Sequence, residues 1–478
     1  MERWLDLAQS KQQLPLGQQF GKLSDGADMI SLALCGGDGG EGIEGLKAVL
    51  RHARTKLEIQ KAEEEYEAQG YRPLRNWLSA AYADEEGRAT DPMQLLLASG
   101  SAEAIDVILR WRLSGGRGTV LLETPASPEV LESIRQQGGH AVQVPCDEEG
   151  MLMDSLERYI ARDRPSLLYV TLHFSNPSGR VWSEERKREL LRLGARHSLF
   201  IVEDESAGAI PFSCCRKGES LERGTGSLKR QAKPQGEKLG VEGREKQVEC
   251  EKLKEPGKAV ITVNPMSPVN RTRKHHTLYR LQQEEPLLYA GMEVIGIGSF
   301  QATAFPSLPV AWVRGSEGVI EALTHFRSAR GGRRGKAPAQ EKAAYEQRLY
   351  ALLSAPAFSW PVHAARLEAE YAARRAALLQ QLREQAVWQG ASFEEPQGGL
   401  FLWLRLPPGL CSEALLRAAL PKGAAFMPGA RCYAAGAGEQ PDGDAIRLTF
   451  AAHRAARLRQ GMARIAEAIA EFTARGMG

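Results

Sequence analysis

Several features that mark particular classes of protein are missing from this sequence. Its seven cysteines include no CxxC pair, and no histidine stands at metal-ligand spacing from any of them. We therefore expect free thiols in a reducing compartment. Residues 1–16 carry four charges and no apolar stretch long enough for a signal peptide or a spanning helix. These absences exclude a disulfide scaffold and a membrane anchor at this end, and indicate a cytoplasmic protein.

A large excess of charge of one sign is also absent. Lys and Arg number 62 against 59 Asp and Glu, which gives a net charge of +3. The body of the protein therefore has no electrostatic reason to bind nucleic acid. One basic run could form a contact patch, although a solvated charge run is the better interpretation; it consists of Arg271, Arg273, Lys274, His275 and His276. The ligands of the protein must be inferred from local sites.

Short apolar runs alternate with longer amphipathic stretches from about residue 98 onward. A chain of 478 residues exceeds what one hydrophobic core usually fills, so two or more domains are expected. The apolar runs predict buried strands at residues 119–122, 141–144, 167–171 and 199–203. Between them, helical periodicity covers residues 102–112, 127–137, 153–161 and 183–195. Strict alternation predicts an α/β domain with an open, mostly parallel sheet covered on both faces.

The character of the chain changes twice. Residues 213–258 are rich in Lys, Glu, Gly and Gln, which predicts a disordered or loosely held surface insertion, at about 213–285 in all. After about residue 340, a helix at 372–382, strands at 399–406 and 446–451, and a closing helix through Ile469 predict a separate α+β lobe. We expect residues 1–95 to supply an N-terminal segment and part of the small lobe, 96–330 the large domain, and 331–478 the small domain.

Small and polar residues follow several of the predicted strands. Gly100, Ser101 and Ala102 open a helix, where backbone N–H groups can cradle a phosphate or form an ordinary cap. Asn176 lies in an Asn-Pro-Ser-Gly turn after a strand, where ligand-facing loops of such sheets lie. Ser299 ends the strand-like run at 294–297.

Two charged residues adjoin or interrupt apolar strands. Asp204 directly follows one strand, at a depth where an unpaired carboxylate is costly, so it is either a helix cap or a partner for a protonated ring nitrogen. Arg447 lies inside another strand and needs an anionic partner. That partner is either a substrate carboxylate, which the guanidinium fork matches, or a structural salt bridge.

Taken in order, these segments resemble the pyridoxal-phosphate-dependent aminotransferases of class I/II, which have fold type I and are similar to aspartate aminotransferase. The branch that includes the aminotransferase domains of MocR-type regulators is especially similar. The resemblance spans about residues 30–475, interrupted by the insertion. It rests on Tyr66 with residues 69–75, on 168–171, on Phe174 with 176–179, and on 201–204, 398–403 and 446–450.

The resemblance implies roles for the residues singled out above. Gly100, Ser101, Ala102 and Ser299 would bind the cofactor phosphate, Asn176 the 3-oxygen of the pyridine ring, and Asp204 its protonated nitrogen. Tyr66 would reach the phosphate of a neighbouring subunit, which implies a homodimer. Arg447 would hold the carboxylate of an amino or keto acid.

The resemblance fails at the residue that carries the chemistry. The family pattern Gly-Ser-Phe-Ser-Lys-Thr is here residues 298–303, and Pro306 and Trp312 keep the frame, so the lysine position is Ala302. A phosphate-binding arginine becomes Pro309, an aromatic residue that stacks on the ring becomes Ser127, and a tyrosine becomes Ala207. In the family, that lysine holds the cofactor covalently and moves a proton, and loss of a general base costs roughly 10² to 10⁴ in rate. We expect no catalytic residue here and no covalent cofactor.

Three alternatives remain open at this point. The protein could still transaminate with a substitute base, but Lys258 and Lys274 lie in the insertion and nothing places either at the crevice. It could be a regulatory sensor domain related to MocR-type regulators, without DNA binding of its own, because residues 1–29 are too short for a winged helix-turn-helix. It could also be a decayed gene product with a structural fate.

Overall fold

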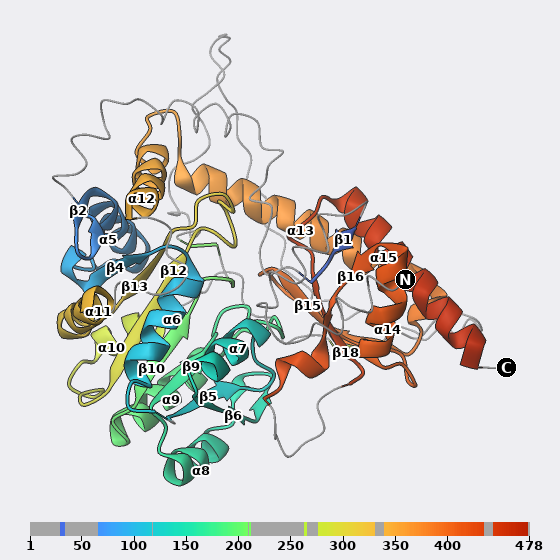
Figure 1. Ribbon diagram of the computed structural model, residues 1–478, viewed down its shortest axis with the longest axis horizontal. Coiled ribbons are helices and arrows are strands. Elements are labelled where there is room, and N and C mark those ends of the chain that lie inside the picture. The colour runs from blue at the N-terminus through green and yellow to red at the C-terminus, as the bar shows by residue number, and fades with distance from the viewer. Residues whose placement is uncertain are drawn as a thin grey trace, which may run out of the picture.

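Two lobes make up the part of the chain that the computed structural model describes (Figure 1). The described residues are 29–33, 66–116, 118–208, 210–211, 262–264, 276–329, 339–434 and 443–476. In Figure 1 the larger lobe holds most of the blue, green and yellow elements, and the smaller lobe holds most of the orange and red ones together with the blue strand β1 (Ile30–Ser31). Much of the predicted insertion, including Lys258, Lys274 and the basic run up to His275, lies outside these residues.

A seven-stranded sheet in the order β4-β13-β12-β10-β9-β5-β6 forms the centre of the large lobe. Its strands are β4 (Leu95–Ala98), β5 (Thr119–Glu123), β6 (His140–Val144), β9 (Leu167–Val170), β10 (Phe200–Asp204), β12 (Glu293–Ser299) and β13 (Ala311–Arg314). Only β13 runs antiparallel to its neighbours, β12 and β4. The other pairs are parallel, with side chains that are mostly apolar and buried. The predicted α/β class with a mostly parallel sheet is confirmed.

Helices cover both faces of this sheet. One buried cluster joins the sheet to α6 (Ser101–Arg112), α7 (Pro128–Gln136) and α11 (Glu317–Ala329). The opposite cluster joins it to α8 (Met153–Asp163), α9 (Glu184–Arg196) and α10 (Leu278–Glu284). Helix α5 (Arg72–Glu86) packs against β3 (Gly70–Tyr71) and β4. The carboxyl ends of the parallel strands therefore meet at one edge, where loops can form a site.

Helix α10 and strand β11 (Thr262–Asn264) fall inside the range expected for the insertion. Leu278, Tyr279 and Leu281 of α10 are buried in the core of the large lobe. The sequence pattern did not predict this helix, because seven residues are too few to show helical periodicity beside a long polar run.

The small lobe is built on a five-stranded sheet in the order β11-β14-β15-β18-β17. Its remaining strands are β14 (Ser392–Glu394), β15 (Phe401–Arg405), β17 (Met427–Pro428) and β18 (Ala445–Thr449). The helices of this part of the chain are α12 (Ala339–Leu353), α13 (Trp360–Glu384), α14 (Ser412–Ala419) and α15 (Ala455–Gly476). Near the start of the chain, β1 (Ile30–Ser31) pairs in parallel with β16 (Ala424–Ala425), so segments far apart in sequence meet here.

Short elements complete the described structure. Two antiparallel pairs join β2 (Tyr66–Glu67) to β3 and β7 (Cys146–Asp147) to β8 (Gly150–Met151). Four 3₁₀ turns are η1 (Pro92–Gln94), η2 (Ala386–Trp388), η3 (Leu420–Lys422) and η4 (Gly429–Cys432). Among the described residues, no helix has both the length and the apolar content needed to cross a bilayer.

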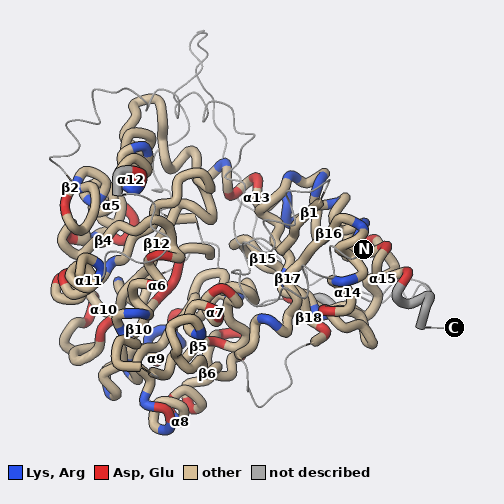
Figure 2. The backbone as a smooth tube through the Cα atoms, viewed as in Figure 1, with Lys and Arg blue, Asp and Glu red and all other residues tan. Residues whose placement is uncertain are grey.

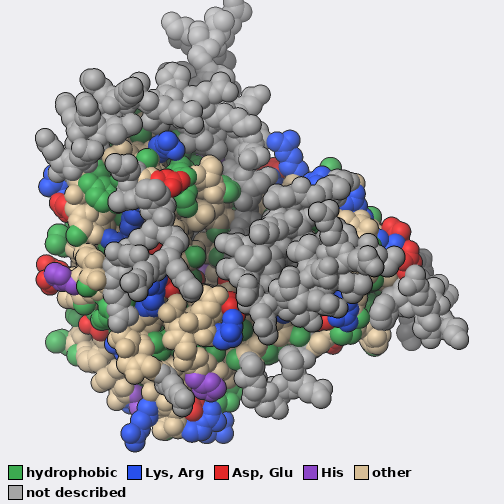
Figure 3. Space-filling model, in the orientation of Figure 1, with side chains coloured by type: hydrophobic (Ala, Val, Ile, Leu, Met, Phe, Trp, Pro, Cys, Tyr) green, Lys and Arg blue, Asp and Glu red, His purple; other side chains and the backbone are tan. Residues whose placement is uncertain are grey.

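Charges of both signs are interspersed over the two lobes (Figure 2). On the face shown in Figure 3, blue and red side chains lie among green and tan ones over the residues that are coloured. This distribution agrees with the nearly balanced composition of the whole chain.

Candidate functional site

A cavity opens beyond the carboxyl ends of the strands of the large lobe. Its walls come from the loops after β5, β9 and β10. The lining residues are Ser127, Thr171, His173, Phe174, Asn176, Asp204, Ala207 and Gly208. Four of these, Ser127, Asn176, Asp204 and Ala207, were singled out from the sequence, and the fold brings them together although 80 residues separate the first from the last.

Asp204 presents a buried carboxylate to this cavity. One carboxylate oxygen accepts a short hydrogen bond from the Tyr169 hydroxyl, and the other accepts one from the Ser206 backbone N–H at 2.8 Å. Burial raises the pKa of Asp204, although these hydrogen bonds oppose the shift. Because both donors are neutral, the site favours a positively charged hydrogen-bond donor as an additional partner.

A hydrogen bond between Asn176 and Arg447 joins the two lobes beside this cavity. Asn176 Oδ1 accepts a hydrogen bond from Arg447 Nη1 at 2.6 Å. The Asn176 amide is thus oriented with its oxygen toward the guanidinium and its NH₂ group turned the other way. Arg447 lies in the middle of β18 with a fully buried side chain, stacked over the Phe401 ring at 4.7 Å.

Glu129 supplies the anionic partner of Arg447. Glu129 Oε1 accepts from Arg447 Nη2 at 3.1 Å, and Glu129 Oε2 accepts from Nη1 at 3.4 Å. Nη2 also donates to the Ala33 carbonyl at 2.9 Å, and Ser127 Oγ donates to Glu129 Oε2 at 2.7 Å. Of the two partners considered for Arg447 from the sequence, the structure contains the intramolecular salt bridge.

The sequence pattern could not single out Glu129, because acidic residues are common in the first turn of a helix. Burial opposes ionisation of Glu129, but the charge and hydrogen bonds of Arg447 and the Ser127 hydroxyl outweigh it, so its pKa is lowered. The carboxylate therefore stays ionised beside the guanidinium.

Gly100 caps α6, and Ser101 and Ala102 form its first turn. Gly100 has φ +89°, and a Cβ built there would meet Gln301 Oε1 at 2.7 Å. The Ser99 N–H at this helix start donates to the Glu103 carboxylate at 2.5 Å. An anion from the chain itself, together with the Gln301 amide, thus lies beside the turn where a phosphate was expected.

The expected phosphate end of the site also includes three later residues, Ser299, Ala302 and Pro309. Ser299 is fully buried; its hydroxyl donates to the Val310 carbonyl at 2.9 Å and accepts from the Gln301 N–H at 3.0 Å. Ala302 is partly buried and packs against the main apolar cluster. Neither Ala302 nor Pro309 can supply a positive charge to this end of the site.

Tyr66, in β2, lies close to the Glu346 carboxylate of α12; burial, followed by the negative charge of Glu346, raises the pKa of its hydroxyl. Its partner in the structure is therefore a residue of the same chain. The expected contact between Tyr66 and a neighbouring subunit concerns a second chain and stays a prediction.

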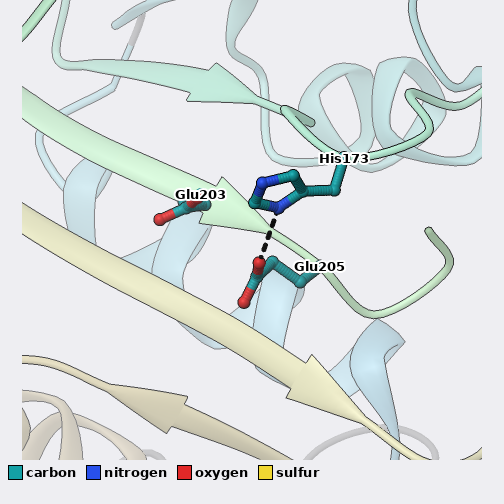
Figure 4. A group of neighbouring side chains, drawn as sticks. All are labelled: His173, Glu203 and Glu205. Atoms are coloured by element: carbon teal, nitrogen blue, oxygen red, sulfur yellow. Dashed lines mark hydrogen bonds and ion pairs between the residues drawn. The ribbon is translucent and has the colours of Figure 1, made fainter. Parts of the chain in front are cut away.

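Figure 4 shows three neighbouring ionisable side chains, His173, Glu203 and Glu205. They belong to a network that adjoins the cavity, because His173 also lines it. His173 Nδ1 is 3.0 Å from Glu205 Oε1, and His173 Nε2 is 2.7 Å from Lys187 Nζ. Glu203 accepts from the Leu278 N–H at 2.8 Å. Burial lowers the pKa of Lys187 to about 8 and raises that of Glu203 well above its usual range. The sequence analysis missed this network, whose members are too far apart in the chain to form a local motif.

Lys187 is the cationic member of this network. Both ring nitrogens of His173 are engaged, and the positive charge of Lys187 interacts with the carboxylates of Glu203 and Glu205. Lys187 contacts His173 and the His276 carbonyl but is not among the residues that line the cavity. Among the described residues, no lysine lines that cavity.

Comparison with known proteins agrees with the motifs and the fold. The model of the family "Aminotransferase class I and II" matches residues 28–208. A 2-aminoadipate transaminase of Thermus thermophilus is 27% identical over 426 residues, covering 89% of this chain and 86% of that protein. The chain is thus similar to aminotransferases of class I and II, by the family model over residues 28–208 and by this relative over most of its length. The HTH-type transcriptional regulator YdfD of Bacillus subtilis is 24% identical, covering 86% of this chain and 68% of that protein.

Solved aminotransferases share the fold over nearly the whole chain. An α-aminoadipate aminotransferase of T. thermophilus has a TM-score of 0.68 and 23% identity, covering 98% of this chain and 97% of that one. A kynurenine aminotransferase of Pyrococcus horikoshii has a TM-score of 0.68 and 22% identity, covering 97% and 96%. The predicted fold type I architecture is confirmed.

Proposed function

We propose that this protein binds pyridoxal or pyridoxamine phosphate without a covalent bond and does not carry out ordinary transamination. The observation that carries the proposal is a contrast between the residues at the cavity and the residue at position 302. Asp204 and Asn176 remain at the cavity, whereas position 302, where the family pattern has its lysine, is an alanine. We propose Gly100, Ser101, Ala102, Asn176, Asp204, Ser299 and Tyr66 as the cofactor-binding residues.

The polar side chains at the ring end of the site match the polar groups of a pyridine ring. The buried Asp204 carboxylate, with neutral donors, would hold the ring nitrogen in its protonated form, and the Asn176 amide would donate to the 3-oxygen. When bound, the cofactor supplies an electron-withdrawing pyridinium ring to an attached amino acid. Asp204 maintains that charge, and Arg447 holds the orientation of Asn176.

The phosphate end fits less well. Pro309 replaces a family arginine, Glu103 places a carboxylate at the helix start, and the Ser299 hydroxyl proton is used by the Val310 carbonyl. A charge-assisted hydrogen bond contributes about 1.5 to 3 kcal/mol, so loss of the arginine alone would weaken binding about tenfold or more. Without a lysine at residue 302, the site also has no amine to hold the cofactor or to move the substrate proton there.

The small-molecule ligand is proposed to be an amino acid or its keto acid. The transaminase relative of T. thermophilus is named for 2-aminoadipate, which belongs to that class. A homodimer is also proposed, with Tyr66 near the subunit boundary.

Titration with pyridoxal phosphate, followed by its visible absorbance, tests this function. We expect reversible binding that dialysis removes, and binding about tenfold to hundredfold weaker in Asp204→Asn, because the variant removes the charged partner of the ring nitrogen. Asp154→Asn, an exposed change of the same kind, should bind like the unmodified protein. Equal affinity in Asp204→Asn would remove the basis of the proposal.

A regulatory sensor is the second candidate. The similarity to the regulator YdfD, across 86% of this chain, favours it. A gel-shift assay with regulatory DNA from the protein's own source tests this candidate: a sensor without DNA binding of its own should not retain the DNA, and retention by this chain alone would instead favour a complete regulator.

A further inference from the structure

The guanidinium of Arg447 is already committed to groups of the protein. Its Nη1 donates to Asn176 at 2.6 Å and Glu129 at 3.4 Å, and its Nη2 donates to Ala33 at 2.9 Å and Glu129 at 3.1 Å. Each terminal nitrogen carries two N–H groups, so these contacts use both directions in which each can donate. Glu129 faces both nitrogens, which is the geometry of a bound carboxylate.

Arg447 and Glu129 differ in their freedom to move. The Arg447 side chain is 0% exposed, lies in the central part of a strand and packs over Phe401. The Glu129 side chain is 33% exposed and begins at the first turn of α7. Its carboxylate also accepts hydrogen bonds from Ser127 and from its own backbone N–H. Glu129 is therefore the partner that can rotate toward water, whereas Arg447 is held in place.

We propose that Glu129 is an internal stand-in for a ligand carboxylate, so that an amino or keto acid reaches Arg447 only when Glu129 leaves. This inference rests on the proposed function in one respect, since it takes the ligand to be a carboxylate. Glu129 thus competes with every ligand carboxylate for Arg447 and lowers the apparent affinity of each. Ser127 stabilises this arrangement, because its hydroxyl donates a hydrogen bond to Glu129. In the family pattern, an aromatic residue stands at position 127.

The size of the effect follows from a population argument. When Arg447 is free of Glu129 in only a fraction of molecules, the apparent Kd for a ligand carboxylate equals the intrinsic Kd divided by that fraction. If Glu129 is bound in about 90 to 99% of molecules, its removal lowers the Kd about tenfold to hundredfold.

Isothermal titration calorimetry with 2-oxoglutarate, in the absence of cofactor, tests the inference. We compare the unmodified protein, Glu129→Gln, and Glu132→Gln as the matched control on the same helix, where Glu132 pairs with the exposed Arg135. Glu129→Gln should bind about tenfold to hundredfold more tightly than the unmodified protein. Glu132→Gln should not differ from it. Adding Arg447→Gln to Glu129→Gln should remove the gain.

Three results would overturn the inference: equal Kd values for the unmodified protein and Glu129→Gln, weaker binding by Glu129→Gln, or a gain that persists without Arg447. Circular dichroism establishes that each variant is folded. If Glu129→Gln does not fold, Glu129→Asp replaces it, because the shorter carboxylate loosens the pair; it should bind several-fold more tightly, and an unchanged Kd would count against the proposal. Since no cofactor is present, failure to bind pyridoxal phosphate leaves this result standing, and the two proposals fail separately.

Discussion

At the scale of single residues, the chemistry of this crevice depends on the side chain at residue 302. Ala302 is partly buried beside the main apolar cluster and follows the turn after β12. A methyl group there can neither bond to an aldehyde nor carry a proton. The residues proposed to bind the ring, Asp204 and Asn176, line the cavity. Under the proposed function, the site retains groups that would recognise a ring and lacks the group that would react.

Restoring the amine should restore covalent attachment. In Ala302→Lys, pyridoxal phosphate should survive dialysis, and borohydride reduction should fix it to residue 302, as detected by peptide mass spectrometry. Ala302→Met is the matched control, because it has an unbranched side chain without an amine. A folded Ala302→Lys protein with no adduct would mean that residue 302 does not face the cofactor.

Glu203 carries a pH dependence of stability. Burial is the main cause that raises its pKa above the ordinary value of 4.5. The folded state thus binds this proton more tightly than the unfolded state, so the contribution of Glu203 is fully present below pH 4.5 and is lost as the pH rises through the folded pKa.

Glu203→Gln should therefore gain stability relative to the unmodified protein as the pH rises from about 4.5, since glutamine keeps an oxygen to accept from the Leu278 N–H. Urea unfolding at a series of pH values measures this difference. Glu185→Gln, at a side chain 73% exposed, should run parallel to the unmodified protein. A constant difference for Glu203→Gln would show that its pKa is not raised.

At the scale of elements, the start of α6 is the most constrained part of the phosphate end. Gly100 has φ +89° and ψ 166°, a region that is essentially restricted to glycine, and Gln301 fills the space where a Cβ would lie. Gly100→Ala should lower the free energy of unfolding by about 1 to 3 kcal/mol in urea denaturation.

Gly115→Ala is the control, because a Cβ at Gly115 meets nothing within 4 Å and its φ lies outside the left-handed region. Its stability should stay within about 0.5 kcal/mol of the unmodified protein. Similar losses in both variants would contradict the strain assigned to Gly100.

Elements with a strong local signal could be predicted from the sequence. Buried parallel strands read as continuous apolar runs, so residues 167–171 were predicted where β9 (Leu167–Val170) lies. Ser183 was assigned to the start of a helix and is in fact its N-cap, accepting from the Arg186 N–H at 3.2 Å. Helix α10 is short and follows a polar run, so its pattern was not distinguishable.

Contacts between distant segments could not be predicted. Glu129 and Arg447 are 318 residues apart, and nothing local marks them as a pair. Lys187 belongs to an amphipathic helix in which a lysine is ordinary, and only the fold brings it to His173. Asp204 and Asn176 were found because each lies at or beyond the carboxyl end of an apolar strand.

At the scale of the whole molecule, the site belongs to neither lobe alone. Arg447 comes from β18 of the small lobe, and its partners Asn176 and Glu129 come from loops and a helix of the large lobe (Figure 1). Ala33, near the start of the described chain, belongs to the same cluster, because its carbonyl accepts a hydrogen bond from Arg447. Any rearrangement that separates Arg447 from Glu129 or Asn176 therefore also changes contacts between the lobes.

Borohydride reduction of the unmodified protein, mixed with pyridoxal phosphate and analysed by intact and peptide mass spectrometry, tests the central claim most directly. Loss of covalent attachment predicts no cofactor-sized mass increase on any single residue. Lys187 is the most informative position, because its nitrogen lies 2.7 Å from a histidine of the cavity wall and burial lowers its pKa to about 8. A stoichiometric adduct on Lys187, or on another single lysine, would contradict the account.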